Sequence, residues 1–247
     1  MGGTVFVTGG STGTGAAAVR AFVRDGRPVA FLDSNGPAGR TLAEELGGQA
    51  LFVAGDVRER ADLKHAADEA EARFGPLGAV FANAGIHRFN SVLDVTDAAL
   101  EEVLSINLLG TIATVRETAP RLVAAGGGAI VLMASDQALI GKRNSFAYGL
   151  SKGAVGQMAK SMALDLGPKG VRVNAVCPGT IRTPLTEAIF ERMADPAAAW
   201  AAEGGTYPLG RVGSAEEVAE VVCFLASERA RFVTGALWPV DGGLTAG

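Results

Sequence analysis

The chain has 247 residues, 34 of them glycine, with 48% hydrophobic and 19% charged residues. Collagen is excluded because the glycines follow no three-residue repeat, and intrinsic disorder is excluded because the apolar share is too high. The net charge of -4, without any basic block, argues against nucleic acid or an anionic membrane as the main partner.

Short and nearly continuous apolar runs predict strands that are buried on both faces. In chain order these are Thr4–Thr8, Pro28–Leu32, Ala50–Ala54, Ala79–Ala82, Ala129–Ala134, Val171–Val176 and Ala236–Val240. Longer stretches between them predict the helices Gly15–Asp25, Arg40–Leu46, Glu59–Phe74, Ala98–Ala125, Ser145–Leu166 and Ala215–Ala226. This alternation predicts an α/β fold of one domain, residues 1–247, with a doubly wound, seven-stranded parallel sheet of the Rossmann type. Ser214 and Glu217 predict a capping box at the start of the last helix.

Residues 180–211 break the alternation with three prolines and a pair of glycines. A long irregular insertion in a compact domain is usually functional, so this segment is predicted to be a substrate lid. The uncharged apolar stretch Leu122–Ser135 is too short to span a membrane. The first strand begins so early that we expect no signal peptide, and Cys177 and Cys223 are expected to be reduced thiols of a cytoplasmic protein.

A glycine-rich segment directly follows the first predicted strand and opens the first helix. Glycines at such a turn let the backbone approach a pyrophosphate, and the helix N-terminus offers free N–H groups to the phosphates. A glycine turn alone is weak evidence, but its place between strand and helix predicts a dinucleotide site. The loop residues expected to hold the cofactor are Gly9, Ser11, Thr12, Gly13, Thr14 and Gly15.

Asp33 and Ser34 follow the second predicted strand. A carboxylate at this point accepts hydrogen bonds from the adenosine ribose and repels a 2′-phosphate. No arginine or lysine lies in the glycine loop or directly after the aspartate. The segment therefore predicts NAD rather than NADP, and the alternative is a solvated aspartate at a strand end.

Tyr148 and Lys152 lie four residues apart in a predicted helix, so their side chains share one face. A cation beside a tyrosine lowers the pKa of the phenol and makes it a usable general acid and base. Such a pair is also common on helix surfaces. Ser135, however, follows a predicted strand at the sheet edge where ligands bind, and Asn107 is a polar residue on an apolar helical face.

In order and spacing, these residues resemble the short-chain dehydrogenase/reductase family in its compact, single-domain form. The resemblance extends over essentially the whole chain. The motifs that carry it are Thr8–Gly15, Asp56-Val57, Asn83-Ala84-Gly85, Asn107, Ser135, Tyr148-x-x-x-Lys152, Pro178-Gly179 and Asp241-Gly242-Gly243. The chain departs from the family pattern at Ala134, where a second serine is common.

The resemblance implies reversible hydride transfer between a nicotinamide and a carbinol carbon, by a homotetramer. It implies that Tyr148 is the catalytic acid and base, that Ser135 orients the substrate oxygen, and that Lys152 lowers the pKa of the tyrosine and binds the nicotinamide ribose. It also implies that Asn107 holds a water of a proton relay. The further cofactor residues that it implies are Asp56, Val57, Asn83, Ala84, Gly85, Pro178, Gly179, Ile181 and Thr183.

Three arginines lie close in sequence to the predicted site, and a guanidinium fork suits a carboxylate. The residues expected to bind substrate are Arg88, Ser135, Gln137, Arg143, Tyr148 and Arg182. They predict a polar hydroxy acid or sugar acid, and the run from Ser135 to Tyr148 is similar to family members that act on deoxy-keto sugar acids. The alternative is that the arginines are solvated loop residues. His87 is expected to be a lone exposed histidine.

The first functional hypothesis is therefore an NAD-dependent oxidoreductase that interconverts a secondary alcohol and a ketone. The alternatives are an NADPH-dependent β-ketoacyl or carbonyl reductase and a non-catalytic dinucleotide-binding sensor. We expect a small-molecule substrate and metal-free catalysis, since no cluster of residues has metal-ligand spacing. A serine hydrolase is a poor fit, because neither His65 nor His87 has a plausible nucleophile partner.

Overall fold

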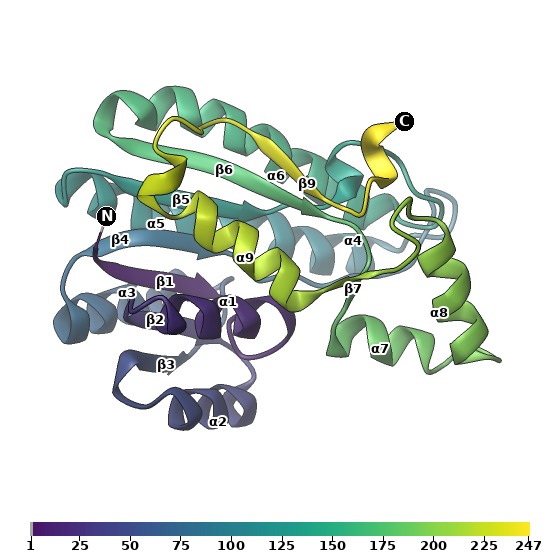
Figure 1. The fold of residues 1–247 in the computed structure, drawn as a ribbon, viewed down its shortest axis with the longest axis horizontal. Helices are drawn as coiled ribbons and strands as arrows, with labels where there is room; N and C mark the ends of the chain where they lie inside the picture. Colours follow the sequence, from purple (N-terminus) through teal and green to yellow (C-terminus); the bar gives the residue numbers. More distant parts are fainter. Residues whose placement is uncertain (1) are drawn as a thin grey trace.

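Seven parallel strands form the central sheet of the computed structural model, which describes residues 2–247 (Figure 1). Their order is β3-β2-β1-β4-β5-β6-β9. The strands are β1 (Thr4–Thr8), β2 (Val29–Asp33), β3 (Ala50–Ala54), β4 (Leu77–Ala82), β5 (Gly128–Met133), β6 (Val171–Pro178) and β9 (Leu237–Val240). All seven predicted strands are confirmed, with ends that move by at most two residues. The order reverses between β1 and β4, which stay paired to their ends, and the helices that follow them cover opposite faces of the sheet. Ligands bind at the carboxyl ends of the strands at such a point.

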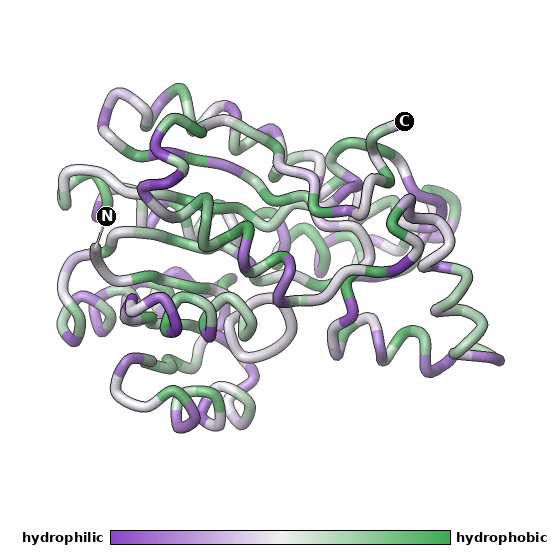
Figure 2. The backbone as a smooth tube through the Cα atoms, viewed as in Figure 1, coloured by the Kyte–Doolittle hydropathy of each residue, from purple (hydrophilic) through white to green (hydrophobic). Residues whose placement is uncertain are grey.

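Helices cover both faces of this sheet and enclose two hydrophobic cores. The helices of the main body are α1 (Gly13–Arg24), α2 (Gly36–Leu46), α3 (Arg60–Phe74), α4 (Asp97–Leu104), α5 (Thr111–Ala124), α6 (Phe146–Leu166) and α9 (Ala215–Leu225). The first core joins one face of the sheet to α1 and α9, and the second joins the other face to α3, α5 and α6. Figure 2 shows the apolar residues concentrated along the strands, as burial on both faces requires.

The helix predicted over Ala98–Ala125 is interrupted, which corrects the expectation of one regular helix. A π-helical turn, Ser105–Gly110, separates α4 from α5. Such wide turns are rare and often lie at functional sites. The whole run, Asp97–Ala124, is long and apolar enough to cross a membrane by length and composition alone. In this fold it packs against β4, α3 and α6, as the helix of a protein core does.

Proline also begins helices where the sequence analysis expected loops. The segment 180–211 contains α7 (Pro184–Phe190) and α8 (Pro196–Gly205), so it is not irregular. Thr183 and Asp195 cap these helices, and each proline stands in the first turn, where its missing N–H costs nothing. For the same reason α2 begins at Gly36 rather than Arg40. The predicted capping box of Ser214 and Glu217 is confirmed.

The two helices of this segment extend beyond the carboxyl ends of the strands (Figure 1). A short parallel pair, β7 (Ile181–Arg182) with β8 (Gly213–Ser214), closes the base of the segment. Phe190 of α7 stacks on Trp200 of α8 with ring centroids 3.9 Å apart. The segment is therefore a helical hairpin with its own aromatic contact, held at both ends to the main body.

Candidate active site

A cavity of about 1080 Å³ runs along the carboxyl edge of the sheet, from the glycine loop to the helical hairpin. One end is lined by residues of the glycine loop, the end of β2 and the segment after β4. The other end is lined by residues that follow β5, by the start of α6 and by residues of α7 and α8. The cavity has room for an elongated cofactor and a small substrate in line.

At two positions of the glycine loop, the backbone is packed too closely against its neighbours to admit a side chain. A Cβ on Gly15 would lie 1.9 Å from the Gly9 carbonyl oxygen, and one on Gly9 would lie 2.7 Å from the Ala84 Cα. Asn83 Nδ2 donates to the Gly9 oxygen at 2.8 Å and fixes the loop against the end of β4. This explains why the Thr8–Gly15 and Asn83-Ala84-Gly85 motifs occur together in one chain.

The loop also fits the phosphates of a dinucleotide. The side chain of Thr12, the N-cap of α1, accepts no hydrogen bond from the first N–H groups of the helix. The Ser11 hydroxyl is buried and finds no hydrogen-bond partner within residues 2–247. Free N–H groups and an unpaired hydroxyl at a helix N-terminus are the groups that bind a phosphate. Gly9, Thr12, Gly13 and Thr14 line the cavity here.

The Asp33 carboxylate is held at the edge of this loop. Its Oδ2 accepts the Ser11 N–H at 2.9 Å, and its Oδ1 accepts the Asn35 N–H at 2.8 Å. Asp33 and Ser34 both line the cavity, as do Asp56 and Val57. Arg58 lines it as well and pairs with Asp56 at 2.5 Å, a contact that holds the pKa of the Asp56 carboxyl below its usual range.

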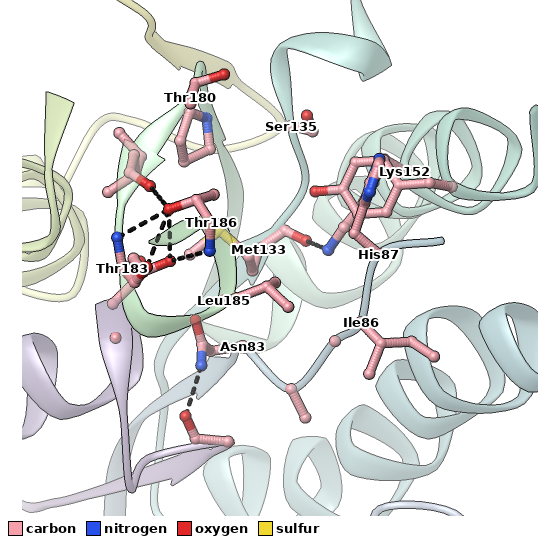
Figure 3. A pocket seen from close by; sticks show the side chains of 18 of the residues that line it. Asn83, Ile86, His87, Met133, Ser135, Lys152, Thr180, Thr183, Leu185 and Thr186 are labelled. Atoms are coloured by element: carbon pink, nitrogen blue, oxygen red, sulfur yellow. Dashed lines mark hydrogen bonds between the residues drawn. The ribbon is translucent and has the colours of Figure 1, made fainter. Parts of the chain in front are cut away.

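Ser135, Tyr148 and Lys152 line the same cavity, and the Tyr148 phenol interacts with Ser135. Figure 3 shows Ser135 and Lys152 at this site. Lys152 Nζ donates to the Met133 carbonyl oxygen at 2.7 Å and lies 5.6 Å from the centroid of the Tyr148 ring. Ser135 Oγ donates to Asp136 Oδ1 at 2.8 Å and accepts the Gln137 N–H at 3.2 Å. The strand end of β5 and the first turns of α6 thus bring the hydroxyl, the phenol and the ammonium into one site.

Burial controls the pKa values of this group. It raises the pKa of the Tyr148 phenol to about 12, although the interaction with Ser135 lowers it in part. Burial also lowers the pKa of Lys152 from 10.5 to about 8. Burial of the phenol therefore outweighs the lowering effect of Ser135, while the Lys152 ammonium bonds to the Met133 carbonyl. The lowering of the Tyr148 pKa by Lys152 stays a prediction.

Asn107 is fully buried in the π-helical turn, beside Lys152. Its Oδ1 accepts the Ile86 N–H at 2.8 Å, and its Nδ2 donates to the Ile86 carbonyl oxygen at 2.9 Å and to Ser151 Oγ at 3.2 Å. A Cβ on Gly85 would lie 3.3 Å from Asn107 Oδ1 and 3.5 Å from Lys152 Nζ, so all three residues adjoin. Asn107 thus joins the segment after β4 to α6.

The site also contains a histidine that sequence reasoning placed elsewhere. His87 is half-buried, not exposed, and its ring contacts that of Tyr148 edge to face at 4.5 Å. Its Nε2 lies 3.1 Å from Ser145 Oγ. Burial, with the charges of Lys142 and Arg88, lowers the pKa of His87 to about 4, so the ring is neutral at pH 7. A weak indication that His87 belongs to the site is present in the sequence, because it follows Asn83-Ala84-Gly85 after one residue, Ile86.

The predicted substrate residues divide into two groups. Ser135, Gln137, Arg143 and Tyr148 line the cavity. Arg88 instead pairs with Glu102 at 2.8 Å, and Arg182 pairs with Glu187 at 3.1 Å and covers the Trp200 ring. Neither is among the described residues that line the cavity. The fold turns these two guanidinium groups toward nearby surface carboxylates.

Pro178, Gly179, Ile181 and Thr183 line the cavity opposite Ser135. Thr186 Oγ1 donates to the Ile181 carbonyl oxygen at 2.6 Å, and the threonines at 183 and 186 cap α7 reciprocally (Figure 3).

Three charged residues that were not predicted to bind substrate also line the cavity: Asp136, Lys142 and Glu203. Asp136 directly follows Ser135, which was the available signal. Among residues 2–247, no group of three or more histidine, cysteine or acidic residues is placed to hold a metal ion.

Comparisons with known proteins agree with this geometry. Residues 9–245 match the family model described as enoyl-(acyl carrier protein) reductase. The chain is 42% identical to L-fucose dehydrogenase of Mus musculus, over all of this chain and 89% of that protein. It is 37% identical to 2-(S)-hydroxypropyl-CoM dehydrogenase 3 of Xanthobacter autotrophicus, over 98% of this chain and 96% of that one.

Solved structures share the whole fold. A short chain dehydrogenase family protein from Francisella tularensis is 34% identical with a TM-score of 0.89, and the match covers all of both chains. Aldohexose dehydrogenase of Thermoplasma acidophilum is 32% identical with a TM-score of 0.91, over all of this chain and 95% of that one.

Proposed function

Since the chain belongs to the short-chain dehydrogenase/reductase family and is an oxidoreductase acting on CH–OH groups, we propose that it is an NAD-dependent dehydrogenase of a secondary alcohol on a polar, hydroxyl-rich molecule. The observation that carries this proposal is the convergence of Ser135, Tyr148 and Lys152 in one cavity with the glycine loop and Asp33. Relatives that act on L-fucose and on aldohexoses support a sugar-like substrate. Because Arg88 and Arg182 are paired outside the cavity, the hydroxy acid expected from the three arginines has less support.

Asp33 supports NAD as the cofactor. Its carboxylate is fixed by the Ser11 and Asn35 N–H groups, so it can accept the adenosine ribose hydroxyls but would repel a phosphate on them. The residues proposed to hold the rest of the cofactor are Ser11, Thr12, Gly13, Thr14, Asn83, Gly85, Lys152, Gly179 and Thr183. When bound, NAD⁺ supplies a hydride acceptor whose positive ring favours a phenolate nearby.

The protein residues would handle the proton. Ser135 would position the substrate oxygen beside Tyr148. Its hydroxyl donates to Asp136 and accepts the Gln137 N–H, and these bonds hold its oxygen in place at the cavity. As a phenolate, which the charge of Lys152 would stabilise, Tyr148 would take the proton from the substrate hydroxyl and become a neutral phenol. We further propose a homotetramer that works in the cytoplasm.

Initial rates with NAD and NADP test the cofactor assignment. We expect NAD to be preferred by the wild type, and Asp33→Ala to reduce this preference by about tenfold or more, as the loss of charged hydrogen bonds predicts. Asp25→Asn, an exposed carboxylate paired with Arg24, is the matched control. A wild-type preference for NADP would contradict the assignment and favour the alternative reductase.

Tyr148→Phe tests the proton chemistry. We expect it to bind NADH with unchanged affinity but to lose about 100-fold or more in kcat, because a general acid and base contributes on that order. NADH fluorescence titration and steady-state kinetics measure the two effects. Full turnover by Tyr148→Phe would instead favour a different proton acceptor, and no turnover by the wild type on any alcohol would favour a dinucleotide sensor.

A further inference from the structure

The substrate end of the cavity carries charges that the proposed proton transfer does not use. They are Asp136, Lys142 and Glu203, called here the charged cluster. Lys142 Nζ lies 2.7 Å from Asp136 Oδ2, and the Asp136 side chain is 2% exposed. A buried carboxylate of this kind needs a partner, and Lys142 supplies it. Only one of the three N–H donors of the ammonium is needed for that contact.

Glu203 belongs to α8 of the helical hairpin and bonds to residues at the base of the same segment. Its Oε1 accepts a hydrogen bond from the Thr180 hydroxyl at 2.5 Å and another from the Tyr207 hydroxyl at 3.2 Å. The Tyr207 oxygen in turn accepts a hydrogen bond from the Thr180 N–H at 2.7 Å. In the described part of the chain, both bonds of this carboxylate use Oε1. Its Oε2 therefore keeps its acceptor capacity, in a residue that lines the cavity.

Lys142 lines the same cavity as Asp136 and Glu203 and is bonded to Asp136. Burial by itself lowers the pKa of Lys142. The bond to Asp136 and the charges of Tyr207 and Glu203 raise this pKa by more, so the net pKa lies above the usual value. The ammonium is thus charged at neutral pH, and two carboxylates face one cation. Arg143 lines the cavity as well, but its side chain is exposed to solvent.

With two carboxylates and one buried ammonium, the charged cluster disfavours an anionic group of the substrate beside it. A carboxylate of the substrate would meet Glu203 and would compete with Asp136 for Lys142. A neutral hydroxyl group avoids both costs, since it donates to a carboxylate and accepts from an ammonium at once. Neighbouring hydroxyls on one ring can use both partners together.

We propose that Lys142 and Glu203 form a hydroxyl-binding subsite, with Asp136 holding Lys142 in place, that selects a neutral polyhydroxylated substrate such as a cyclic sugar over a hydroxy acid. This inference rests on the proposed function and narrows its substrate class. Glu203 Oε2 accepts one ring hydroxyl and a free N–H of Lys142 donates to a neighbouring one. The reacting hydroxyl stays at Ser135 and Tyr148.

The first test is a substrate panel with NAD: neutral aldohexoses and 6-deoxyaldohexoses, and 2- and 3-hydroxy acids of similar size. We expect kcat/KM for the best neutral sugar to exceed that of every hydroxy acid by about tenfold or more. A preference for a hydroxy acid would overturn the subsite while leaving the dehydrogenase function intact. If NADH binds but no member of the panel is oxidised, the proposed function fails together with the subsite.

The second test compares Glu203→Gln with Glu187→Gln, an exposed carboxylate of α7 that pairs with Arg182 outside the cavity. Glutamine can still accept the Thr180 hydroxyl, so the hairpin keeps its attachment. We expect Glu203→Gln to raise KM for the sugar about 10- to 100-fold with little change in kcat or in the Kd of NADH. Glu187→Gln should match the wild type. An unchanged KM in Glu203→Gln, or an equal loss in both variants, would refute the subsite.

Discussion

At the scale of one residue, Lys152 shows that a side chain needed for function can reduce the stability of the folded protein. Its side chain is 3% exposed, and its charge is satisfied within the protein by the Met133 carbonyl. Desolvation lowers its pKa from 10.5 to about 8, a shift that corresponds to about 3 kcal/mol of lost stability for the charged form. The function requires the cation at a place where the fold would favour an apolar side chain.

Lys152→Met should therefore separate stability from activity. We expect the variant to unfold at the same temperature as the wild type or a higher one at pH 7, while kcat falls about 100-fold or more. The folded pKa lies below the unfolded one, so the unfolded wild type binds more protons and the wild type gains stability as pH rises from about 8 to 10.5.

Thermal unfolding from pH 6.5 to 9.5 measures this effect. The difference in melting temperature between Lys152→Met and the wild type should be largest below pH 8 and should shrink above it. A variant that is much less stable than the wild type at pH 7 would contradict the argument. It would show that the bond to the Met133 carbonyl outweighs the desolvation of the charge.

At the scale of an element, the glycine loop and the π-helical turn bring side-chain amides against backbone groups that a regular strand or helix would not reach. The loop brings the end of β1 against Asn83, and the wide turn brings Asn107 against Ile86 and Ser151. In each case a side-chain amide bonds to backbone groups of a segment distant in sequence. The backbone geometry and the amide therefore depend on each other.

Gly15→Ala tests the loop. Its Cβ would lie 1.9 Å from the Gly9 oxygen and 2.7 Å from Asn83 Nδ2, so the loop must move away from Asn83. We expect the Kd of NADH to rise about tenfold or more and the melting temperature to fall. Gly48→Ala, which meets no atom within 4 Å, is the control and should behave as the wild type. Unchanged cofactor affinity in Gly15→Ala would show that the close packing is not required for binding.

At the scale of the whole molecule, α6 has two functions on opposite faces. One face carries Tyr148 and Lys152 into the cavity. Phe146 and Leu150 are large apolar residues that are 41% and 51% exposed, and their spacing of four residues places them on one short stripe. We propose that this stripe is an association surface of the homotetramer.

Light scattering after size-exclusion chromatography should give about 100 kDa, four times the 25.1 kDa chain. Leu150→Lys should dissociate the assembly, because it buries a charge in an apolar interface. Leu150→Met keeps an apolar side chain of similar volume and should remain assembled. A wild-type mass of about 25 kDa, or an intact assembly with Leu150→Lys, would contradict a role of this stripe in association.

The amino-acid sequence alone determined the sheet, most helix positions and the residues at the carboxyl edge. These follow from local rules: a strand buried on both faces is a continuous apolar run, and the ends of parallel strands meet at one edge. The same rules placed Ser135 after β5 and the Tyr148–Lys152 pair on α6. Turn glycines indicated the loop because few other residues fit such a backbone.

Only the tertiary structure decided which charges face the cavity and how burial shifts their pKa values. Arg88 and Arg182 looked like substrate residues in the sequence, yet each meets a carboxylate on its own surface. Glu203 and Lys142 gave no signal, since they lie 61 residues apart and come together only through the helical hairpin. Electrostatic partners depend on distance in space, whereas hydrophobic periodicity depends on distance along the chain, and a single sequence records only the second.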